Sequence, residues 1–266
     1  MPDLTGKILI ITGSTQGVGE GVAMQAAECG AAGIVTCGRN RANGESVAAA
    51  LQEKGCHSEY VQADLGRVED CRRVVKTCDE IFGRVDGLVN AAGLTTRGTL
   101  DDTTVDLWDE LFAVNTRAPF LLTQETVRIM KREKIAGSIV NILSVAAHCG
   151  LDYICAYSAT KGALSTFTKN TAESLLSDRI RVNGINLGWT DTPNEHKVQV
   201  KMGRPKNWME IAESRLPFGR LIKTYDMGHL CAYLLSEESG LMTGALIDYD
   251  QRVIGAYGNL LADKDA

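Results

Sequence analysis

The chain has 266 residues, of which 44% are apolar and 23% are charged, proportions typical of ordinary globular proteins. Its net charge of −5 argues against binding to nucleic acid or to an anionic membrane. No apolar stretch approaches the roughly 18–20 residues of a membrane span, and the N-terminus lacks the pattern of a signal peptide. The length suits one α/β domain over residues 1–266, and the expected location is cytoplasmic.

The eight cysteines form no C-x-x-C pair. In a chain of this size such cysteines are expected to be reduced and buried, where they behave as small hydrophobic side chains. Their spacing does not predict a metal site, and no metal is expected.

Short β-rich runs alternate with amphipathic helical stretches along the chain. Strands are predicted at 7–11, 33–37, 59–62, 87–90, 138–143, 181–186 and 245–249, and helices at 17–29, 43–54, 67–82, 105–131, 155–176 and 225–235. Two of the strands, 8–11 and 138–143, are continuous apolar runs, which is typical of a sheet covered on both faces. The alternation predicts right-handed crossovers and a doubly wound parallel sheet.

The stretch 189–220 has the least regular pattern in the chain. It holds three of the five prolines and two of the three tryptophans, and its charges are mixed. Late in an α/β chain, such a stretch is typical of a lid or a substrate-binding loop. A surface excursion that packs only for stability is the alternative.

A glycine cluster, T12-G-S-T-Q-G-V-G19, follows the first strand and opens the first helix. Glycines there permit a tight turn and let the backbone approach a pyrophosphate, while the amides of the helix N-terminus meet the anionic phosphates. The position between a strand and a helix makes this a predicted dinucleotide site. The residues expected to bind the cofactor here are Gly13, Ser14, Thr15, Gln16, Gly17, Val18 and Gly19.

Ligands of such sheets bind at the carboxyl ends of the strands, where three further segments fall. The second strand ends at Gly38, where an acid would bind a ribose 2′-hydroxyl, and Arg39 follows it. The missing carboxylate and the guanidinium favour NADP(H), although Gln16 is not a second cation and a solvated Arg39 would leave NAD(H) open. The cofactor residues expected at these ends are Gly38, Arg39, Asn40, Asp64, Leu65, Asn90, Ala91, Ala92 and Gly93.

Tyr157 and Lys161 stand four residues apart, so on a helix they share one face. An ammonium group beside a phenol favours the phenolate. Lowering a tyrosine pKa from ~10 to ~7 needs about 4 kcal/mol of differential stabilisation, and a tyrosine tuned in this way suits alcohol oxidation, which needs a base near neutrality. Ser144 lies thirteen residues before Tyr157.

Together these motifs make the chain resemble the short-chain dehydrogenase/reductase family in its single-domain form. The resemblance covers nearly the whole chain and rests on T12-G-x-x-x-G-x-G19, N90-A-A-G93, Asn115, Ser144 and Y157-x-x-x-K161. It implies a three-layer Rossmann fold with a seven-stranded parallel sheet, a nicotinamide cofactor, and a homotetramer or dimer.

The resemblance also implies roles for individual residues. Tyr157 is expected to be the general acid/base, and Lys161 is expected to lower its pKa and to hold the nicotinamide ribose. Ser144 is expected to bind the substrate oxygen, although it could instead cap a turn. Asn115 is expected to hold a water that links Lys161 to solvent, and Asp64 either contacts the adenine or caps the helix near Arg67.

Two segments depart from the family pattern. In N186-L-G-W-T-D-T192, Leu187 replaces the usual proline, which predicts a less rigid loop. The loop is still expected to bind the carboxamide, through Gly188, Trp189, Thr190 and Thr192. Beyond the last strand, L246-I-D-Y-D-Q251 replaces the usual Asp-Gly-Gly, and the tail 250–266 is expected to cap either its own pocket or a neighbouring subunit's site.

The candidate pocket residues mix polar groups with aromatic surfaces, which indicates a sugar, a polyol or another small hydroxylated compound. Besides Ser144 and Tyr157, they are Thr95, Arg97, Val145, His148, Leu151, Tyr153, Trp189, Asn194, Glu195 and His196. A hydrolase triad of Ser144, His148 and Asp152 is not supported, because no G-x-S-x-G elbow surrounds the serine.

Three functions remain open. The first is an NAD(P)(H)-dependent enzyme that interconverts a secondary alcohol and a ketone. The second is a 3-oxoacyl-carrier-protein reductase, for which Lys197, Lys201, Arg204 and Lys206 could dock an acidic carrier protein. The third is a cofactor-binding regulatory module, which the complete set of catalytic residues argues against.

Overall fold

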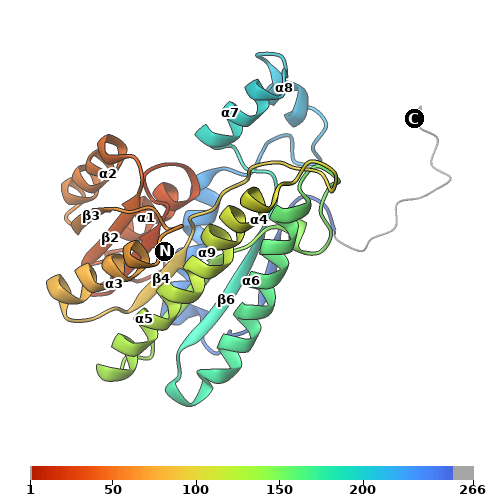
Figure 1. The fold of residues 1–266 in the computed structure, drawn as a ribbon. Helices are drawn as coiled ribbons and strands as arrows, with labels where there is room; N and C mark the ends of the chain where they lie inside the picture. The colour runs from red at the N-terminus through yellow and green to blue at the C-terminus, as the bar shows by residue number, and fades with distance from the viewer. Residues whose placement is uncertain (1, 254–266) are drawn as a thin grey trace.

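The computed structural model describes residues 2–253, which form a seven-stranded, fully parallel sheet (Figure 1). The strand order is β3-β2-β1-β4-β5-β6-β7. The strands are β1 (Ile8–Thr12), β2 (Gly33–Gly38), β3 (His57–Gln62), β4 (Gly87–Asn90), β5 (Ser138–Ile142), β6 (Arg181–Leu187) and β7 (Leu246–Tyr249). The predicted doubly wound sheet is confirmed. The strand order reverses between β1 and β4, and in such sheets this switch point opens the ligand crevice.

Helices cover both faces of the sheet. They are α1 (Gly17–Glu28), α2 (Arg41–Glu53), α3 (Val68–Phe82), α4 (Val105–Phe112), α5 (Ala118–Arg132), α6 (Cys155–Ser174), α7 (Pro193–Lys201), α8 (Trp208–Glu213) and α9 (Thr224–Leu235). Successive side chains of a strand point to opposite faces, so Leu9 and Ile11 pack towards α1 and α9 while Ile8 and Ile10 pack towards α3 and α5. This explains why β1 is apolar at every position from Ile8 to Ile11.

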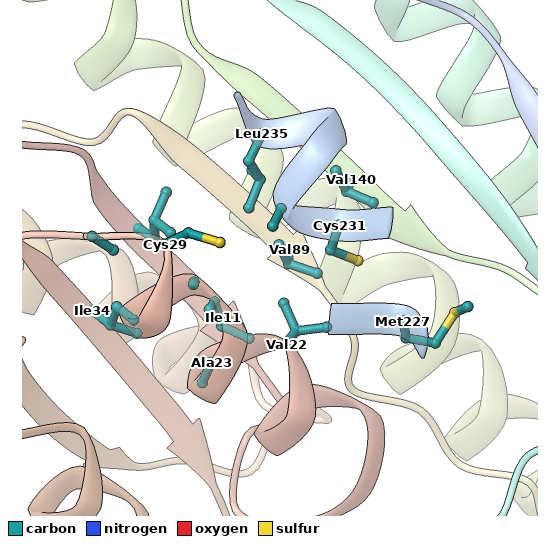
Figure 2. Packing of buried hydrophobic residues seen from close by; sticks show 14 of the residues in the cluster. Ile11, Val22, Ala23, Cys29, Ile34, Val89, Val140, Met227, Cys231 and Leu235 are labelled. Atoms are coloured by element: carbon teal, nitrogen blue, oxygen red, sulfur yellow. The ribbon is translucent and has the colours of Figure 1, made fainter. Parts of the chain in front are cut away.

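The layer formed by α1 and α9 packs closely on the strands that lead to the crevice. Figure 2 shows Val22 and Ala23 of α1 and Met227 and Cys231 of α9 converging on the sheet. Burying each of the larger of these side chains contributes about 1.5–3 kcal/mol to folding. The two helices touch through glycine: a Cβ on Gly21 would lie 2.7 Å from Thr224 Cβ and the Thr224 carbonyl oxygen. This close packing fixes the position of α1, whose N-terminus faces the crevice.

The predicted single helix over 105–131 is two helices joined by a π-helical turn, Ala113–Arg117. The turn holds Asn115, whose side chain bonds the loop after β4 and not its own helix. Pro119 begins the second helix, where its missing N–H costs nothing. π-Turns of this kind often occur at functional sites.

The stretch 189–220, predicted to be irregular, contains α7 and α8. They stand above the end of the sheet, apart from the body of the fold (Figure 1). Thr192 caps α7 by accepting the Glu195 N–H at 3.1 Å, and Pro193 occupies the first helical position. Pro193 therefore starts a helix here, whereas the sequence suggested only a loop.

Candidate active site

One cleft of about 1900 Å³ follows the carboxyl edge of the strands, from the loop after β2 to the inner side of α7 and α8. A typical small-molecule pocket has roughly 300–1,000 Å³, so the cleft has room for a dinucleotide and a substrate together. It is lined by the residues that follow β1 to β6.

The glycine turn after β1 is shaped by contact with the loop after β4. Gly13 has a φ of +64°, and a Cβ there would lie 2.6 Å from the Ala92 Cα. Thr12 fastens the same two loops, because its Oγ1 accepts the Ala91 and Ala92 N–H groups at 3.0 and 3.1 Å. Gln16, at the N-cap of α1, gives no side-chain cap, so the first amides of α1 remain available to an anion in the cleft.

At the far end of the cleft, the rim carries guanidinium groups. Arg39 and Arg67 both line it, and neither forms an ion pair within residues 2–253. A side chain at position 38 would require Thr15 to move, since a Cβ would lie 2.6 Å from Thr15 Cγ2. Asp64 turns its Oδ1 to the Gly66 N–H at 3.0 Å, so it caps the turn before α3 and does not cap the helix at Arg67. This end of the cleft therefore carries two guanidinium groups on its rim.

Lys161 lies on α6 with 4% of its surface exposed. Its Nζ donates to the Ile142 carbonyl oxygen at 2.7 Å and lies 5.8 Å from the centre of the Tyr157 ring. Burial lowers the pKa of its ammonium to about 8. The predicted pairing of Tyr157 and Lys161 on one helix face is therefore present in the structure.

The pKa of Tyr157, however, is raised above its ordinary value and not lowered. Desolvation of the phenol is the largest cause, and the negative charge of Glu195 adds to it, while a hydrogen bond with Ser144 acts in the opposite direction. This direction is opposite to the sequence-based expectation for the chain by itself, because desolvation by the surrounding protein is the largest influence on this pKa. At neutral pH the hydroxyl is protonated and is ready to donate to a carbonyl oxygen.

Ser144 follows β5 and has 8% of its surface exposed. Its Oγ accepts the Ala146 N–H at 3.1 Å and caps the short turn Val145–Ala147. Capping uses only an oxygen lone pair, so the hydroxyl hydrogen can be donated to the Tyr157 oxygen or, with a substrate bound, to the substrate oxygen. The two roles considered for this serine are therefore compatible.

Asn115 is fully buried behind the cleft. Its Oδ1 accepts the Leu94 N–H at 2.8 Å, and its Nδ2 donates to the Leu94 carbonyl oxygen at 2.9 Å and to Thr160 Oγ1 at 3.1 Å. The side chain thus clamps the loop that carries Gly93. The proton relay through a water held by Asn115 stays a prediction.

Most of the predicted cofactor residues line the cleft. They are Gly13, Thr15, Gln16, Gly17, Val18, Gly19, Gly38, Arg39, Asp64, Leu65, Ala91, Ala92, Gly93, Tyr157, Lys161, Gly188, Trp189, Thr190 and Thr192.

Three predicted cofactor residues lie elsewhere and have structural partners. The Ser14 hydroxyl donates to the Ile11 carbonyl oxygen and accepts the Cys37 N–H, tying β1 to β2. Asn40 caps α2, and Asn90 is buried against Asn141, to which its Nδ2 donates at 2.8 Å. These positions adjoin the motifs in sequence, but their side chains bond structural partners and do not line the cleft.

The substrate side is a network that joins α7 to the loop after β4. Arg97 lies over the Tyr153 ring, 4.8 Å from its centre, and forms an ion pair with Glu195 at 3.8 Å. Trp189 donates from Nε1 to Glu195 Oε1 at 2.8 Å, and Asn194 donates to Thr95 Oγ1 at 3.3 Å. The predicted residues that line this end are Thr95, Arg97, Ser144, Val145, Leu151, Tyr153, Tyr157, Trp189, Asn194 and Glu195.

The two candidate histidines do not line the cleft. His148 Nε2 lies 2.7 Å from Asp248 Oδ1 of β7 and 3.1 Å from Asn186 Nδ2, so the predicted substrate contact of His148 is not seen. His196 pairs with Asp191 at 2.8 Å and packs edge-on against Trp208. Both histidines therefore contact other protein side chains and do not line the cleft.

The inner side of the two lid helices supplies apolar residues that the sequence alone did not indicate: Val198, Met202, Trp208 and Ile211. Trp208 is 6% exposed and stacks on Trp189 with ring centres 5.8 Å apart. The missed signal was T192-P-N-E195, a capping residue, a proline at the first helical position and an acid at the third. It predicts a helix whose inner face then follows the helical period.

The two departures from the family pattern have local explanations. Leu187 is 8% exposed and extends β6 by pairing with Tyr249, so this position is held by the sheet and is not loosened. Beyond β7, Asp250 and Arg252 line the cleft, and the Gln251 side chain donates to the Arg220 carbonyl oxygen at 2.6 Å. The rest of the predicted capping tail, residues 254–266, lies outside the described residues.

Six of the eight cysteine thiols are buried, Cys155 is half-buried and Cys149 is exposed. Over residues 2–253, no three His, Cys, Asp or Glu side chains gather in a way that could hold a metal ion. In the same part of the chain, none of the helices has the length and apolar character needed to span a bilayer.

Comparison with known proteins shows the family of this chain. A family model described as enoyl-(acyl carrier protein) reductase matches residues 13–251. An NADP-dependent (R)-specific alcohol dehydrogenase of Lentilactobacillus kefiri is 32% identical over 244 residues, which cover 91% of this chain and 94% of that protein. A 3-oxoacyl-acyl-carrier-protein reductase of Thermotoga maritima is 32% identical over 248 residues, which cover 93% of this chain and 97% of that protein.

Among solved structures, an actinorhodin polyketide ketoreductase with NADPH matches with a TM-score of 0.87, covering 94% of this chain and 98% of that chain. At 24% identity, this likeness shows the fold alone. The family match and the two relatives agree with the motifs at the carboxyl edge of the sheet. The chain therefore belongs to the short-chain dehydrogenase/reductase family of NAD(P)-dependent oxidoreductases.

Proposed function

We propose that this enzyme uses NADP(H) to interconvert a secondary alcohol and a ketone on a sugar, a polyol or another small hydroxylated compound. The observation that carries the proposal is the convergence of Ser144, Tyr157 and Lys161 on one cleft with the glycine turn after β1. The apolar inner side of α7 and α8 favours a substrate with an apolar or aromatic portion.

The residues divide the chemistry between them. A bound nicotinamide would supply or accept the hydride. In the reductive direction, the protonated Tyr157 hydroxyl donates its proton to the carbonyl oxygen, and the Ser144 hydroxyl donates a hydrogen bond to the same oxygen. Lys161 holds its charge behind the phenol and stabilises the phenolate that is left.

The preference for NADP(H) rests on charge at the adenosine end. Position 38 has no carboxylate to bind a 2′-hydroxyl, and Arg39 is exposed there without an ion-pair partner within residues 2–253. Arg67 lines the same rim and can supply the second cation that Gln16 does not. A guanidinium group matches a 2′-phosphate well, and the alcohol dehydrogenase relative is named as NADP-dependent.

A second candidate is the reduction of a 3-oxoacyl group on a carrier protein. Lys201 and Arg204 line the cleft mouth, and Lys197 and Lys206 stand exposed nearby on the lid. An acidic carrier could dock on this basic surface. A relative with this activity in its name supports the candidate.

A substrate panel tests the proposal. Sugars, polyols, simple ketones and a 3-oxoacyl-carrier-protein thioester are assayed with both cofactors by the absorbance of the reduced nicotinamide. Tyr157→Phe should reduce kcat by at least about a hundredfold, since it removes the proton donor, and should leave cofactor binding nearly unchanged. A Phe variant with more than about a tenth of wild-type kcat would disprove the acid/base role of Tyr157.

A further inference from the structure

Glu195 is the polar hub of the substrate side. It lies in the first turn of α7, lines the cleft and keeps 16% of its side chain exposed. Its Oε1 accepts the Trp189 Nε1–H at 2.8 Å and the Gln199 Nε2–H at 2.6 Å, and the Arg97 guanidinium lies 3.8 Å from the same atom. All three partners therefore converge on one of its two carboxylate oxygens.

The second oxygen, Oε2, receives no hydrogen bond from residues 2–253. An ionised carboxylate can accept about four hydrogen bonds, and Oε2 is not among the buried atoms of the described residues that lack a partner, so it is accessible from the cleft. The two donors on Oε1 hold the side chain in one orientation. The arrangement thus presents an oriented acceptor to whatever enters the cleft.

The charge around Glu195 favours a neutral donor over a cation. Arg97 already compensates the carboxylate, and Arg97 is itself held over the Tyr153 ring. Glu195 and Tyr157 line the same cleft, and the negative charge of Glu195 adds to the raised pKa of Tyr157. A hydroxyl on the carbon beside the reacting carbonyl is a neutral donor of the kind that Oε2 could bind.

We infer that Glu195 selects substrates that carry a hydroxyl group next to the reacting carbonyl, by accepting a hydrogen bond from that hydroxyl through Oε2. This inference rests on the proposed function and narrows its substrate class to hydroxyketones and the corresponding diols. No covalent step involves Glu195.

The test compares the reduction of 2-hydroxyacetophenone with that of 2-methoxyacetophenone, its methyl ether, using NADPH. The ether keeps the aromatic ring and the oxygen but loses the donor. The wild-type enzyme should prefer the hydroxyketone by about tenfold or more in kcat/KM, as expected for a hydrogen bond to a charged acceptor.

The decisive variant is Glu195→Gln. Trp189 and Gln199 both donate hydrogen bonds, so they bind the oxygen of the new glutamine side chain. The NH₂ group of that side chain then faces the cleft, where the substrate hydroxyl needs an acceptor. The preference for the hydroxyketone should then fall to about one. Glu210→Gln, the same change on an exposed residue of α8 outside the cleft lining, should leave the preference unchanged.

Three outcomes would overturn the inference. An equal loss for both ketones in Glu195→Gln would mean that Glu195 acts only on the lid or on Tyr157. Phenylglyoxylate reduced faster than both ketones would mean that Arg97, and not Glu195, faces the substrate. A wild-type enzyme that reduces neither ketone nor any other member of the panel would refute the proposed function itself. This failure is distinguishable from the other two, because it is measured on the wild-type enzyme and involves no Glu195 variant.

Discussion

Replacing Asn115 with alanine gives a sharp test of how the fold holds its catalytic loop. The substitution removes the hydrogen bonds to the Leu94 N–H, the Leu94 carbonyl and Thr160 Oγ1. At about 1 kcal/mol net each, the three bonds contribute about 3 kcal/mol to the free energy of unfolding. At about 2–4 °C per kcal/mol for a chain of this size, Tm should fall by about 6–12 °C.

The same substitution should reduce activity, because the clamped loop carries Gly93, which lies beside Lys161. A Cβ added at Gly93 would be 3.7 Å from Lys161 Nζ. Loosening this loop displaces the backbone beside the catalytic pair, and a displacement of about 1 Å can cost about a hundredfold in rate. Thermal unfolding followed by circular dichroism and kcat on the best ketone of the panel measure the two effects.

Asn43→Ala is the matched control, since Asn43 is exposed on α2 and its side chain bonds nothing within residues 2–253. It should unfold at the wild-type temperature or slightly above, because alanine is the better helix former. If the Tm of Asn115→Ala lay within about a degree of the Tm of this control, the three hydrogen bonds would contribute nothing measurable to the free energy of unfolding. That result would refute the reasoning.

Three further predictions follow from the same geometry. Arg39→Ala should weaken NADPH binding by about tenfold or more and leave NADH binding nearly unchanged, as measured by fluorescence titration; equal losses would remove the 2′-phosphate argument. Ketone reduction should be constant through neutral pH and fall as the pH rises through about 8, where Lys161 loses its charge while Tyr157 is still protonated; a decline that starts near pH 6 in the kcat/KM profile would contradict these pKa shifts. Alcohol oxidation needs the phenolate and should gain rate as the pH rises, and in Glu195→Gln this rise should begin at lower pH, because the charge that raises the pKa of Tyr157 is gone; an unchanged profile would exclude that electrostatic effect.

The sequence by itself determined the sheet and the place of the site. Strands and helices alternate with clear periods, and parallel strands put their carboxyl ends on one edge. Residues as distant as Gly13, Ser144 and Tyr157 were therefore predictable as neighbours. The helix period alone placed Lys161 on the same face as Tyr157.

Tertiary structure alone decided what each side chain near that edge does. Ser14 and Asn90 adjoin the motifs yet bond to strand neighbours, and His148 bonds Asp248, a hundred residues further along the chain. The sign of the Tyr157 pKa shift depends on how much protein surrounds the phenol, which no local spacing reveals. The orientation of the Glu195 carboxylate depends on partners from three segments of the chain. Burial and hydrogen bonding of this kind are properties of the folded chain and not of its sequence pattern.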